Sequence, residues 1–123
     1  MEKDVEKKFR EAVRGMGGEA YKWVSPGQAG VPDRLVVLPD GTIMGVELKT
    51  DTGRLSKTQV RQIRKLVRLG MECWVLWGEA DVKRWVSQWL APAGLWLAPV
   101  EHDIGMLSCG AYFFPKGGGA DVL

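Results

Sequence analysis

The chain has 123 residues, of which 46% are hydrophobic and 26% are charged, and its formal net charge is +2. This composition indicates one soluble globular domain, large enough to form a core without disulfides. Two cysteines without paired spacing predict a reducing compartment such as the cytoplasm. We expect neither a signal peptide nor a membrane span, and a single histidine argues against a zinc site.

Apolar periodicity and turn residues predict seven elements in the order helix, three strands, helix, strand, helix. They cover residues 2–16, 19–24, 33–38, 42–49, 56–69, 71–77 and 81–90. Ser56 and Gln59 form a capping box for the second helix, and Asp81 caps the third. A helical crossover joins two parallel strands, whereas the hairpin before it is antiparallel. The predicted fold is therefore α/β, with a mixed β-sheet flanked by helices.

The last part of the chain, residues 91–123, differs in composition from residues 1–90. Residues 1–90 form the predicted domain and hold 16 Lys/Arg and 12 Asp/Glu. The tail holds one Lys/Arg and three Asp/Glu, and it is rich in Gly, Pro and apolar residues. The tail can pack on its own domain, cover a sheet edge or contact a dimer partner, and the sequence leaves these alternatives open. Trp85 and Trp89 are core or interface residues and a candidate dimer contact.

The strongest chemical signal comes from Asp33, Glu47 and Lys49. Asp33 ends the motif Gly30-Val-Pro-Asp33, and alternation along the strand 42–49 places Glu47 and Lys49 on one face. Carboxylates suit a hard cation such as Mg²⁺, which needs only one or two of them, and an ammonium suits a phosphate or a water. The pattern predicts metal-dependent phosphodiester cleavage. The alternatives are a turn cap for Asp33, an edge charge for Glu47 and an ion pair between Glu47 and Lys49.

A basic stripe is predicted on the helix after these motifs, in a stretch without acids between Asp51 and Glu72. A solvated helix face usually has acids four residues from its bases, and a phosphate backbone is the natural counter-charge here. The alternative is a solvated face. The stripe consists of Lys57, Arg61, Arg64, Lys65 and Arg68, and further candidates for phosphate contact are Lys22, Arg34 and Arg54.

Taken together, these motifs resemble the virus-type replication-repair nuclease (VRR-NUC) domain of the PD-(D/E)XK superfamily, in its stand-alone phage-type form. The resemblance covers roughly residues 5–90 and rests on Gly30-Val-Pro-Asp33, Asp40-Gly41, Val46-Glu-Leu-Lys49, the run from Thr50 to Ser56, and Gln59. The longer run makes it more specific than a bare Pro-Asp with Glu-x-Lys. The resemblance implies a core in the order α-β-β-β-α-β-α. It also implies a Mg²⁺- or Mn²⁺-dependent endodeoxyribonuclease for branched or structured DNA, and a homodimer that cuts Holliday junctions.

The resemblance also implies roles for single residues. Asp33, Glu47 and the backbone carbonyl of Leu48 would bind the metal, which activates the attacking water. Lys49 would position or help deprotonate that water and offset charge on the transition state.

Two residues, Glu6 and Gln59, have a second interpretation in addition to the role that the resemblance implies. Glu6 is similar to the first-helix glutamate of the superfamily, which contributes a metal ligand or orients a metal-bound water, and its alternative is a surface charge. Gln59 is a capping residue by spacing, and by resemblance it also faces the site, where it orients the phosphate or Lys49.

The sequence is also compatible with other functions for the same residues. Flap or fork cutting and restriction-type cleavage would use the same chemistry on another substrate. A non-catalytic DNA-binding module is a further alternative, although clustered carboxylates without metal would repel DNA. The place of action implied by the family is a bacterial or phage-infected cell.

Overall fold

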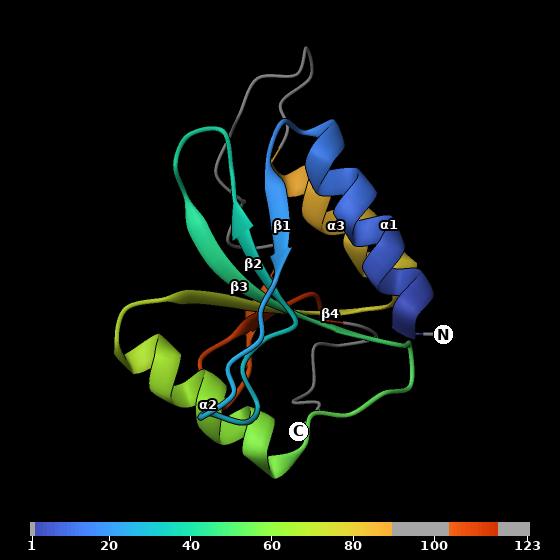
Figure 1. Cartoon of the computed structure of the whole chain (residues 1–123). Helices are drawn as coiled ribbons and strands as arrows, with labels where there is room; N and C mark the ends of the chain where they lie inside the picture. Colours follow the sequence, from blue (N-terminus) through green and yellow to red (C-terminus); the bar gives the residue numbers. More distant parts are fainter. Residues whose placement is uncertain (1, 90–103, 116–123) are drawn as a thin grey trace.

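The computed structural model describes residues 2–89 and 104–115, and it arranges them as a mixed sheet with helices on both faces (Figure 1). The predicted order of the first seven elements is confirmed, and two short strands follow. The elements are α1 (Glu2–Gly15), β1 (Glu19–Lys22), β2 (Arg34–Val37), β3 (Ile43–Lys49), α2 (Lys57–Arg68), β4 (Glu72–Trp77), α3 (Gly78–Trp89), β5 (Gly105–Met106) and β6 (Tyr112–Phe113).

The sheet has six strands in the order β1-β2-β3-β4-β6-β5. The pairs β1–β2 and β2–β3 are antiparallel, and α2 carries the chain across to β4, which runs parallel to β3. Lys49 at the end of β3 lies opposite Trp77 at the end of β4. The carboxyl ends of two central strands therefore meet at the same edge of the sheet.

The alternation predicted for β3 determines which side chains face each helical layer. Met44, Val46 and Leu48 are fully buried beneath α1 and α3, which lie together on one face of the sheet (Figure 1). Phe9 of α1 and Trp85 of α3 are in contact there, with ring centroids 5.2 Å apart. The other face is covered by α2. Glu47 therefore points away from the main core and towards the α2 side.

Local sequence signals account for the boundaries of α2. The Ser56 hydroxyl accepts a hydrogen bond from the Gln59 backbone N–H at 3.1 Å, and the side-chain amide oxygen of Gln59 accepts one from the Ser56 backbone N–H at 2.8 Å. This is the predicted capping box. Gly70 follows the helix with a φ of +101°, a conformation that glycine adopts without a steric penalty.

Two predictions about α3 are wrong. The helix begins at Gly78 rather than at Asp81, and Asp81 is a buried residue of its first turn whose carboxylate accepts a hydrogen bond from the Trp77 backbone N–H at 2.8 Å. Trp85 and Trp89 are 0% and 4% exposed because they pack in the core of their own chain. They are therefore not available as a dimer contact.

The described part of the tail adopts one of the alternatives that the sequence left open. Residues 104–115 carry β5 and β6, and β6 pairs with β4 in parallel, so this segment covers a sheet edge of its own chain. Cys109 and Phe113 are buried there with residues of α2 and β4. The apolar run at 95–100 lies outside the described residues. No described helix combines the length and the apolar character that crossing a membrane requires.

Candidate active site

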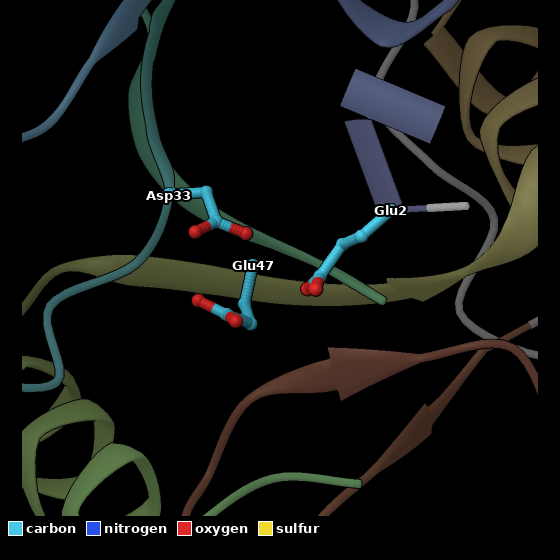
Figure 2. A group of neighbouring side chains, drawn as sticks. All are labelled: Glu2, Asp33 and Glu47. Atoms are coloured by element: carbon cyan, nitrogen blue, oxygen red, sulfur yellow. The ribbon is translucent and has the colours of Figure 1, made fainter. Parts of the chain in front are cut away.

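Three carboxylates meet where the central strands end (Figure 2). Glu2, Asp33 and Glu47 each contribute a carboxylate oxygen, and these oxygens all lie within 4.8 Å of one another. The three residues come from different elements, because Glu2 opens α1, Asp33 immediately precedes β2 and Glu47 lies in β3. The fold therefore gathers acids that are up to 45 positions apart in the sequence.

Close contacts of the loop before Asp33 explain the glycine and the proline of its motif. Gly30 has a φ of +86°, and a Cβ atom there would lie 2.7 Å from the carbonyl oxygen of Thr58 in α2. A Cβ atom on Gly45 of β3 would lie 3.0 Å from the Pro32 ring. The loop can therefore lie against both α2 and β3. This contact brings Asp33 to the end of the sheet, where its carboxylate accepts a hydrogen bond from the Leu48 backbone N–H at 3.0 Å.

Glu47 is buried with only part of its charge compensated. Its side chain is 1% exposed, and Oε2 accepts a hydrogen bond from the Gln59 amide at 2.8 Å and lies 3.4 Å from Lys49 Nζ. Its other oxygen, Oε1, has no hydrogen-bond partner among the described residues. Burial and the charge of Asp33 raise the pKa of Glu47 to about 8, although Lys49 acts in the opposite direction.

The charges around the site favour a bound cation. Burial also raises the pKa of Asp33, and the Leu48 N–H and Lys49 oppose that shift. Lys49 Nζ lies 4.0 Å from Glu2, so one ammonium group faces three carboxylates. An all-oxygen donor set with an unpaired, buried oxygen suits a hard divalent cation such as Mg²⁺ or Mn²⁺. The residues present therefore fit the metal that the sequence predicted.

The structure places Gln59 in the site as well as in the capping box. One end of its amide bonds to the Ser56 backbone, and the other end donates to Glu47. The two expected roles therefore coexist, and the bond within the site goes to Glu47. Because both ends of the amide are held, α2 fixes the orientation of the Glu47 carboxylate.

Glu2, rather than Glu6, completes the carboxylate group. Glu6 instead lies 3.1 Å from the Arg34 guanidinium, which also donates to the Ala20 carbonyl at 3.3 Å, and the Arg34 side chain is only 11% exposed. Arg34 is thus an internal ion-pair residue of the chain. Sequence reasoning missed Glu2, although it lies one helical turn before Glu6 and on the same side of the helix.

The basic residues predicted to contact phosphate are exposed, with the exception of Arg34, for which that prediction is wrong because its side chain is held inside by Glu6. Gln59 brings the first turn of α2 to Glu47, so the stripe on this helix leads away from the carboxylates. No ion pair found within residues 2–89 and 104–115 includes any cation of the stripe. The exposed cations are Lys57, Arg61, Arg64, Lys65 and Arg68 on α2, Arg54 in the loop before it and Lys22 at the end of β1.

Comparison with known proteins places the chain in a family. Residues 2–80 match the model of the VRR-NUC domain. A protein named "Putative nuclease p44", from Acyrthosiphon pisum secondary endosymbiont phage 1, is 47% identical over 75 residues, which cover 61% of this chain and 81% of that protein. A solved structure described as a VRR_NUC domain superposes with a TM-score of 0.67 at 28% identity, over 72% of this chain and 96% of the other. The residues that match the family model include all three carboxylates and Lys49, and the chain belongs to the VRR-NUC domain family.

Proposed function

We propose that this protein is a metal-dependent endonuclease that cuts branched DNA, and that it resolves Holliday junctions as a homodimer. The observation that carries the proposal is the buried Glu47 carboxylate, which lies beside Asp33, Glu2 and Lys49 and has one oxygen without a hydrogen-bond partner in the described part of the chain. Such a group is costly to bury unless a cation completes it. A phage relative named as a nuclease supports the same chemistry.

Asp33, Glu47 and Glu2 would hold Mg²⁺ or Mn²⁺, with the Leu48 carbonyl as a further ligand. The bound ion would polarise the phosphate and lower the pKa of a water. Gln59 keeps one Glu47 oxygen oriented, which leaves the other for the ion. Lys49 is 13% exposed, so its ammonium group can reach a phosphate at the site and offset the charge that develops on it.

The surface of α2 offers a path for a duplex arm. The helix has 12 residues, so its stripe extends about 18 Å from the carboxylates, which is the length of about five base pairs. Its cations have no ion-pair partner within residues 2–89 and 104–115, and their charge is complementary to that of the phosphate backbone. We therefore propose that one arm of the DNA runs from the cleaved phosphate along α2.

Removing one arginine of the stripe is expected to weaken DNA binding independently of sequence. Arg61→Ala or Arg64→Ala removes one phosphate contact, so the slope of log K against log salt should decrease by about 0.9. Fluorescence anisotropy in Ca²⁺ across a salt series measures this slope. Arg14→Ala, at the far end of α1, is the matched control, and an unchanged slope in both stripe variants would contradict the proposed path.

A homodimer suits a junction because of symmetry. The described part of the chain carries one group of three carboxylates, so one copy supplies one cut. Two copies related by a two-fold axis present two sites to the opposed strands of a four-way junction. This argument supports paired nicks in one binding event rather than a single cut.

Cleavage of a labelled four-way junction tests the proposal, with nicked, flap and linear duplexes as controls, in Mg²⁺, Mn²⁺ and EDTA. We expect paired symmetric nicks on the junction in either metal and none in EDTA. Preferential cutting of flaps or forks would keep the chemistry and change the substrate. Cutting of a linear duplex at one sequence would indicate a restriction-type enzyme. Tight binding without cutting would leave a DNA-binding module.

A further inference from the structure

The consecutive residues Asp33 and Arg34 connect the two faces of the sheet. Neighbouring side chains at the start of a strand point to opposite faces. Asp33 joins the carboxylate group, whereas Arg34 points to the α1 side and binds Glu6 at 3.1 Å and the Ala20 carbonyl at 3.3 Å. The residue beside the proposed metal ligand is thus attached to the helix that supplies Glu2.

Glu2 needs such an attachment because of its place in α1. It is the first residue of the helix, and the first turn lacks half of its internal hydrogen bonds. The first buried residue of the helix is Val5, so packing in the core fixes the helix only from the next turn onward. Glu6 is four residues after Glu2, about 6 Å along the same side of the helix. A fixed Glu6 therefore sets both the rotation and the height of Glu2.

We propose that the ion pair between Arg34 and Glu6 positions Glu2 at the carboxylate group, and that Glu6 is a positioning residue rather than a metal ligand. This inference rests on the proposed function, since it assigns Glu2 to the metal. Glu6 Oε1 accepts a hydrogen bond from the Arg34 guanidinium. The pair is partly buried, with side-chain exposures of 11% for Arg34 and 27% for Glu6. Arg34 also neutralises Glu6, which would otherwise add a fourth negative charge close to Asp33.

Direct Mn²⁺ binding without DNA tests the inference, with electron paramagnetic resonance to count free Mn²⁺. Glu6→Gln and Glu2→Gln should each lower the affinity about 10-fold, as losing an outer partner of a metal site commonly does. The double variant should bind no more weakly than Glu2→Gln alone, because Glu6 acts through Glu2. Wild-type affinity in Glu6→Gln, or an additive loss in the double variant, would overturn the inference.

A charge swap distinguishes positioning from ligation. Glu6→Arg combined with Arg34→Glu keeps the ion pair but removes the Glu6 carboxylate, so affinity should return to within about 3-fold of the wild type. A ligand role for Glu6 predicts no recovery. Thermal unfolding monitors the fold of each variant, and if the swap fails to fold, the glutamine variants decide the question alone.

The matched control is the ion pair between Arg14 and Glu19, which lies at the other end of α1 at 3.4 Å. Arg14→Met with Glu19→Gln should leave Mn²⁺ affinity unchanged. A wild-type protein that binds no Mn²⁺ would refute the proposed function itself. A wild-type protein that binds Mn²⁺ as tightly as Glu6→Gln would refute only the positioning role.

Discussion

Replacing Lys49 by methionine is expected to lower the rate of DNA cleavage by about 10²- to 10³-fold, because it removes a preorganised positive charge from the transition state. Methionine keeps an unbranched stem, so the packing around this side chain, which is 13% exposed, should persist. Single-turnover rates on a nicking substrate, at saturating Mn²⁺, measure the effect. Mn²⁺ affinity and DNA affinity are measured in parallel.

The control for this variant is Lys83→Met, which removes an exposed lysine from α3 and should leave the rate unchanged. Lys49→Arg keeps the charge but spreads it over a planar group, so we expect only partial recovery. Cleavage by Lys49→Met at the wild-type rate would exclude this lysine from the reaction. Loss of Mn²⁺ binding in the variant would instead assign it to holding Glu47 and Glu2.

The sequence was sufficient where local signals decide the structure. The capping box of Ser56 and Gln59 depends on four consecutive residues, and the structure contains both of its hydrogen bonds. The alternation in β3 placed Glu47 and Lys49 on one face because the period of a strand is fixed. The fold class followed in the same way from the order of the seven elements, which the structure contains.

The sequence was not sufficient to predict contacts that depend on the distance between two elements. Glu2 and Glu6 share one side of α1, so helical phase alone cannot say which of them reaches the end of the sheet. That choice depends on the position of the helix along its axis relative to the strands. In the structure Glu6 forms an ion pair with Arg34, and Glu2 lies beside Asp33 and Glu47. The apolar face of α3 was equally ambiguous, since the sequence did not show that Trp85 packs against Phe9 of α1 in the core of its own chain.

The position of the short strand in the tail could not be predicted from the sequence either. Strand β6 has two residues and pairs with β4 through Trp74 and Tyr112. A strand of this length carries no measurable periodicity, and its position depends on an uncovered edge elsewhere in the chain. The sequence therefore predicted the alternatives for this segment but could not choose among them.

The stability of the metal-free protein is expected to fall as the pH rises from about 4.5 to about 8. Glu47 keeps its proton in the folded state up to a pKa of about 8, whereas the unfolded chain releases it near its ordinary pKa of 4.5. Between these values the unfolded state binds fewer protons, so each pH unit costs up to about 1.4 kcal/mol of the free energy of unfolding. Mn²⁺ requires the ionised carboxylate, so it should stabilise the protein more at pH 8 than at pH 5.5.

Glu47→Gln separates this effect from the titration of other groups. The amide has nearly the same shape and no proton to lose, so without metal its stability should vary less between pH 5.5 and 8 and should exceed that of the wild type at pH 8. Chemical unfolding at several pH values, with and without Mn²⁺, measures both curves. The variant should also lose the stabilisation by Mn²⁺, because its side chain offers no carboxylate to the ion. A decline of equal slope in both proteins would assign the pH dependence to other groups and leave Glu47 ionised in the folded state.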